Sequence, residues 1–200
     1  MIEFTSLAQL IVATIFLNNV LLFSFLGLES VTTVEEKPKN ALKLSIALLF
    51  VLPLVSVISF WIYHNVLLKV NDTGDILRDV TYLQTFVFVI TITVVVVIFN
   101  VLIKKVFPKL HSFLGQQSIQ LVSNTVVLGV LLININSVDT LANSFYFSVF
   151  AALGYGLVLM ILTFIEKQLI DAPIPKGFKG LPLQLIILSI IALIFYGLSV

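Results

Sequence analysis

The sequence predicts an all-α integral membrane protein with six transmembrane helices. Of its 200 residues, 60% are hydrophobic and only 10% are charged, and the mean hydropathy is +1.16. A water-soluble domain does not bury that much apolar surface. Because a helix needs about 20 residues to cross the hydrocarbon core, a chain of this length has room for six or seven spans with short connections. We therefore expect a single membrane domain, residues 1–200.

Six apolar runs place these helices, and charged loops separate most of them. The runs are continuous and lack the alternation of barrel strands, so they favour helices, which satisfy their own backbone in lipid. This holds even for the β-branched stretch Thr91 to Ile98. Pro53, inside the second run, predicts a kink. The runs are 7–28, 44–66, 82–103, 119–133, 141–164 and 181–198.

The distribution of cations predicts the orientation. Nine of the eleven lysines and arginines lie in the first, third and fifth loops, and the fourth loop has none. By the positive-inside rule these odd-numbered loops are cytoplasmic, which places both termini outside the cell membrane. The nine residues are Lys37, Lys39, Lys43, Lys104, Lys105, Lys109, Lys167, Lys176 and Lys179.

Three spans in each half predict two inverted repeats, about 1–107 and 108–200, because an odd number of spans reverses the topology of the second half. A polar pair followed by an apolar run occurs in the first span, at Asn18 and Asn19, and again in the fourth, at Ser123 and Asn124. Corresponding polar breaks predict interrupted first and fourth helices that line an ion pathway near the midplane. Alternatively, these side chains only hydrogen-bond neighbouring helices.

Several function classes are disfavoured. The net charge of +1 offers no field for nucleic acid. The chain has no cysteine, which excludes disulfides and thiolate-ligated clusters within it. His64 and His111 have no partner at a metal-ligand spacing, and no catalytic triad or phosphate-binding loop occurs. The N-terminus shows no pattern of a removable signal peptide.

Four blocks in order resemble the six-helix membrane subunits of the Rnf and Nqr respiratory complexes, in particular the RnfA and NqrE branch. The resemblance covers nearly the whole chain. The blocks are NNVLLFSFLGL at 18–28, FPKLHSFLG at 107–115, NTVVLGVLLININ at 124–136 and DAPIPKGFKGL at 171–181.

The resemblance implies an N-terminus outside and a homologous partner of opposite orientation. In complexes of this kind the pair holds a [2Fe-2S] cluster through two cysteines from each partner, and flavin-bearing subunits complete the electron route. The resemblance thus implies a multi-pass protein of the cell membrane, surrounded by lipid, with redox cofactors on its partners.

The chain departs from the family at the cluster. Glu29 and Thr125 stand where the family has its two cysteines. Neither is a usual cluster ligand. We therefore expect a subunit of an Rnf/Nqr-like ion-translocating electron-transport complex that binds no cofactor alone and serves as scaffold or as ion or electron pathway. The alternatives are a transporter or ion-pathway paralogue without a redox role and a purely structural membrane subunit.

Overall fold

The computed structural model describes residues 13–17, 19–27, 38–70, 76–114, 120–169 and 172–197. In these ranges the chain is mostly helical. The π-helix η1 (Ala13–Leu17) precedes α2 (Val20–Ser24), and a second π-helix, η2 (Tyr63–Leu67), extends α4 (Pro38–Ile62). The 3-10 helices are η3 (Thr81–Leu83), η4 (Leu121–Ser123) and η5 (Lys176–Phe178). The other α-helices are α5 (Gln84–Val106), α6 (Pro108–Leu114), α8 (Thr125–Ser137), α9 (Leu141–Leu169) and α10 (Leu181–Gly197).

Three of the described helical segments are long and apolar enough to cross a membrane: 38–67, 81–106 and 141–169. The apolar helices α8 and α10 are shorter, with 13 and 17 residues. The prediction of helix for the β-branched stretch 91–98 is confirmed, since it lies inside α5. The helix α4 continues through Pro53. This architecture fits a multi-pass membrane protein.

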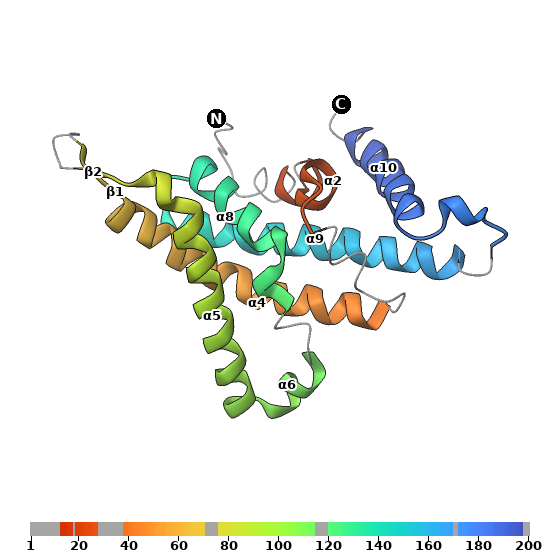
Figure 1. The fold of residues 1–200 in the computed structure, drawn as a ribbon, viewed down its shortest axis with the longest axis horizontal. Helices are drawn as coiled ribbons and strands as arrows, with labels where there is room; N and C mark the ends of the chain where they lie inside the picture. Colours follow the sequence, from red (N-terminus) through yellow and green to blue (C-terminus); the bar gives the residue numbers. More distant parts are fainter. Residues whose placement is uncertain are drawn as a thin grey trace.

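The helices α4 and α9 form the centre of the fold. They lie side by side and run in opposite directions, while α5 leads away from them (Figure 1). The most apolar window of α9 is 56% buried and that of α4 is 50% buried, against 22% for α5. The other elements are therefore positioned chiefly by this antiparallel pair.

Two glycines of α9 allow neighbours to approach its backbone. A Cβ at Gly156 would lie 2.9 Å from the Ser45 Cβ of α4, and one at Gly154 would lie 3.0 Å from the Ile15 Cα of η1. Positions two residues apart on a helix face different directions. The helix α9 thus contacts α4 on one side and the first helical segment on another, and small residues permit both contacts.

A short antiparallel ribbon departs from the all-α prediction. It joins α4 to α5 and consists of β1 (Leu68–Val70) and β2 (Ile76–Asp79). The Asp79 carboxylate accepts hydrogen bonds from the hydroxyl of Thr81 at 2.7 Å and from its backbone N–H at 3.0 Å. These two bonds lower the pKa of Asp79, and the bond from the hydroxyl has the larger effect. A lowered folded-state pKa stabilises the turn at neutral pH, and this contribution is lost as the carboxylate is protonated in acid.

We predict that Gly156→Leu destabilises the protein, because its side chain has no room against Ser45. Overpacking of this kind costs about 1–3 kcal/mol. The thermal unfolding midpoint of the purified protein in detergent should fall by several degrees. Gly197→Leu is the control, since no atom of the described residues lies within 4 Å of a Cβ there. Equal midpoints for the two variants would contradict the close approach of α4 and α9.

Candidate functional site

The first helical segment is interrupted at Asn19, which is fully buried. Its backbone is extended, with φ −62° and ψ 123°, and separates η1 from α2. Its side-chain NH₂ donates to the Ile15 carbonyl at 2.9 Å, and its side-chain oxygen accepts from the Leu21 N–H at 3.1 Å. A helix end leaves such carbonyl and N–H groups without helical partners. One carboxamide therefore satisfies a group on each side of the break.

Asn124 occupies the corresponding place before α8. It is 3% exposed, and its backbone is also extended, with φ −82° and ψ 118°. Its side-chain oxygen accepts from the Val126 N–H at 2.9 Å, as asparagine does at a helix N-cap. The 3-10 helix η4 precedes it, as η1 precedes Asn19. The two interruptions thus share a capping residue and a backbone conformation.

The two interrupted segments meet where α2 ends and α8 begins. The Gly27 N–H donates to the Thr125 hydroxyl at 2.8 Å, across 98 positions of sequence. The Tyr155 hydroxyl of α9 donates to the Gly27 carbonyl at 3.3 Å. The N–H and the carbonyl of Gly27 are therefore both satisfied by side chains from the other half of the chain.

The turn also needs a glycine at position 27. Its φ of +85° is a conformation that residues with a Cβ rarely adopt. A Cβ at Gly27 would lie 2.7 Å from Cε2 of Tyr155. The neighbouring Leu26 packs against Gly129 of α8, where a Cβ would collide with the leucine side chain. The conformation of the turn and its close packing both depend on small residues.

The structure describes some of the residues expected at the site. It places Asn19 and Asn124 at the two interruptions and brings Thr125 to the turn at Gly27. Ser123 ends η4, one residue before the Asn124 cap. Asn18 and Glu29 lie outside the described residues, so the expectations for them stay predictions.

A buried polar cluster that the sequence analysis did not identify joins three helices. The side-chain NH₂ of Asn134, on α8, donates to the Ser56 hydroxyl of α4 at 2.7 Å and to the Ser144 carbonyl of α9 at 3.0 Å. These three residues are at most 1% exposed. Only two hydroxyls inside apolar runs and an amide directly after one pointed to this cluster, and many such residues bond within their own helix.

One acceptor of this cluster has no partner among the described residues. The side-chain oxygen of Asn134 is buried and accepts no hydrogen bond from any described residue. The Ser59 hydroxyl, one turn along α4 from Ser56, has no partner among these residues either. A buried polar atom without a partner costs about 1–3 kcal/mol. Neutral amide and hydroxyl oxygens suit hard cations and water.

We predict that Gly27→Ala destabilises the protein more than Gly180→Ala. Both glycines have a positive φ, but within the described part of the chain nothing lies within 4 Å of a Cβ at Gly180. The Gly180 variant therefore measures the conformational cost alone, about 1 kcal/mol. Crowding by Tyr155 should add about 1 kcal/mol or more to the loss in the Gly27 variant. Denaturant or thermal unfolding of both variants gives the difference, and equal losses would contradict this packing.

We predict that Asn134→Ala and Ser56→Ala are coupled. Each removes the same interhelical hydrogen bond, so the double variant should lose less than the sum of the single losses. Measured couplings of this kind in a membrane protein average about 0.6 kcal/mol. Asn136→Ala is the control, because its exposed amide bonds Leu132 within its own helix. Additive losses for Asn134 and Ser56 would show that they are independent.

Comparisons with known proteins find relatives that match nearly the whole chain. Residues 7–200 match the family model described as "Rnf-Nqr subunit, membrane protein". The protein of Pasteurella multocida that is named as the A component of the ion-translocating oxidoreductase complex is 34% identical over 98% of this chain and 97% of its own. Its namesakes in Pseudoalteromonas translucida and Shewanella baltica are 32% and 33% identical, over 98% and 95% of this chain and 97% and 95% of their own. The chain therefore belongs to the Rnf-Nqr family of membrane subunits.

Proposed function

We propose that the chain is a membrane subunit of an Rnf/Nqr-like ion-translocating electron-transport complex, in which it acts as scaffold or as ion or electron pathway. The observation that carries this proposal is the pair of asparagine-capped interruptions joined through Gly27 and Thr125. The names of its full-length relatives support the complex. Interrupted membrane helices are tolerated where protein or a cavity surrounds them, and they mark functional centres.

The residues at this junction do not fit a thiolate-ligated iron–sulfur cluster. Thr125 has a hydroxyl where a ligand cysteine is expected, and that hydroxyl accepts the Gly27 N–H. The sequence supplies no cysteine at any other position. Cluster ligation requires thiolates or, in some centres, imidazoles. We therefore propose that this chain ligates no [2Fe-2S] cluster and that flavins or clusters belong to partner subunits.

The proposed architecture has six spans in two inverted repeats, with both termini outside. The matched interruptions at Asn19 and Asn124 support repeats, since the same device occurs once in each half. The antiparallel course of α4 and α9 is the course expected of the second and fifth spans in such an arrangement (Figure 1). A homologous subunit of opposite orientation and flavin-bearing subunits are the proposed partners.

The second candidate is an ion pathway without a redox role. The cluster at Asn134 favours it, because its side-chain oxygen is buried and has no hydrogen-bond partner among the described residues. Polar groups inside membrane helices often mark ion routes. In that case α4, α8 and α9 carry the function, and no redox partner is needed.

We predict that the tagged chain, purified gently from its native membrane, retains flavin-bearing subunits and an oppositely oriented homologue. Mass spectrometry identifies the partners, and visible and electron paramagnetic resonance spectra detect their cofactors. Thr125→Ala should leave the g values of any iron–sulfur signal unchanged, since Thr125 is not a ligand. Altered g values would contradict that assignment. A colourless preparation without redox partners would favour the second candidate.

We predict that the accessibility of introduced cysteines reports the expected orientation. The chain has no cysteine of its own that would also be labelled. Lys109→Cys on α6 should be protected from a membrane-impermeant maleimide in intact cells. Asp79→Cys and Thr140→Cys should be labelled, because they lie in the second and fourth loops. All three side chains are exposed, so labelling reports the side of the membrane. The reverse pattern would place both termini in the cytoplasm.

A further inference from the structure

A pocket lined by both polar and apolar residues lies where α9 ends and α10 begins. It has a volume of about 190 Å³ and is lined by Glu166 and Leu169 of α9, Ile174, Lys179 and Gly180 of the connection, and Leu183 and Gln184 of α10. Glu166 is only 8% exposed. The ends of two consecutive apolar helices lie near the boundary between hydrocarbon and headgroups. The pocket is therefore at the depth of lipid headgroups.

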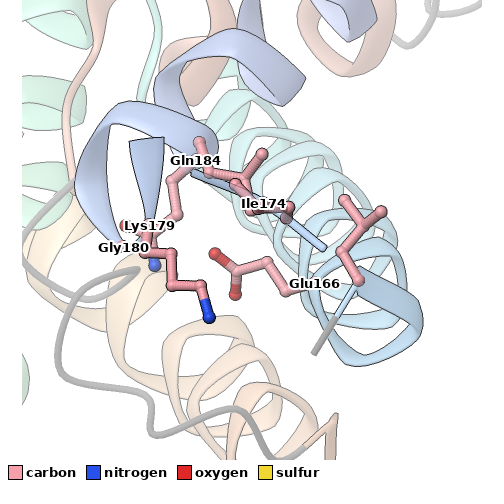
Figure 2. Close-up of a pocket in the computed structure, with 7 residues that line it drawn as sticks. Glu166, Ile174, Lys179, Gly180 and Gln184 are labelled. Carbon is pink, nitrogen blue, oxygen red and sulfur yellow. The ribbon is translucent and has the colours of Figure 1, made fainter. Parts of the chain in front are cut away.

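The charged groups of this pocket have opposite signs and share one space. Figure 2 shows the Glu166 carboxylate and the Lys179 ammonium group both directed into the pocket and toward each other. Two charges of opposite sign complement a ligand that carries both an anion and a cation. An anion alone would be attracted by Lys179 but repelled by Glu166, and a cation alone would meet the reverse, whereas a ligand with both charges is attracted at both ends.

The volume indicates the size of the ligand group that the pocket can enclose. A cavity of about 150 Å³ holds benzene, with six heavy atoms, so the pocket has room for roughly eight. This is the size of a phosphoethanolamine group. The side chains of Leu169, Ile174 and Leu183 add an apolar wall suited to the first carbons of the lipid. A choline group is bulkier, and its quaternary nitrogen donates no hydrogen bond.

We propose that this pocket binds the headgroup of an ethanolamine phospholipid. Lys179 contacts the phosphate, while Glu166 accepts hydrogen bonds from the ammonium group, since a carboxylate accepts several. The side-chain amide of Gln184 is a further polar contact. The proposal is independent of any redox role of the chain.

Lipid binding to the purified full-length chain tests this proposal. Native mass spectrometry, with phosphatidylethanolamine or phosphatidylcholine of identical acyl chains titrated from detergent, gives both dissociation constants. The wild-type chain should prefer phosphatidylethanolamine roughly tenfold, the effect of about one charge-assisted hydrogen bond. No preference in the wild type would overturn the proposal without any variant being needed.

Variants then separate the two charged contacts. Glu166→Gln should abolish the preference, whereas Lys179→Met should weaken the binding of both lipids, because both contain the phosphate. Lys167→Met is the matched control, since this exposed lysine adjoins Glu166 but does not line the pocket. A preference that survives Glu166→Gln would overturn the proposal.

Two further outcomes would also overturn it. If free phosphoethanolamine displaces the phospholipid at equal concentration, the pocket serves a soluble compound. If the exchanged pair Glu166→Lys with Lys179→Glu keeps wild-type stability and the wild type shows no lipid preference, the two side chains only pair with each other.

Discussion

The structure depends on one constraint: in an apolar medium every interruption of a helix must find hydrogen-bond partners for the backbone groups that it exposes. At Asn19 a single carboxamide bonds both the preceding carbonyl and the following N–H. At Asn124 the same type of side chain caps α8. Asparagine is suited to this role because it carries both a donor and an acceptor. The interruptions are therefore specified locally.

The meeting of the two interrupted segments requires long-range contacts as well. Thr125 accepts the N–H of Gly27, and the hydroxyl of Tyr155 on α9 donates to the carbonyl of the same glycine. Because α9 also contacts α4 at Gly156, the central helix pair and the junction form one connected unit. At Thr125, where the family resemblance implies a cluster cysteine, a hydrogen bond between hydroxyl and amide makes the contact. The junction of this chain is thus held together by its own side chains and backbone.

The sequence predicted much of this fold, because hydropathy alone locates the long helices. The expected runs 82–103 and 141–164 fall within 81–106 and 141–169. The fourth run was displaced, since 119–133 includes the interruption and α8 spans 125–137. The polar pairs pointed to Asn19 and Asn124, but the Gly27 turn and the Asn134 cluster depend on contacts between distant segments. Periodicity and composition carry no information about such contacts.

The contacts of Gly27 also bear on biosynthesis. Its N–H and its carbonyl find partners at positions 125 and 155, which emerge from the ribosome long after the turn itself. At about 5–20 residues per second, the delay for the second partner is roughly 6–26 seconds. During this interval these two groups lack the partners that they have in the folded protein. The turn at Gly27 is thus synthesised early, but its two side-chain hydrogen bonds form only after the second half of the protein has been made.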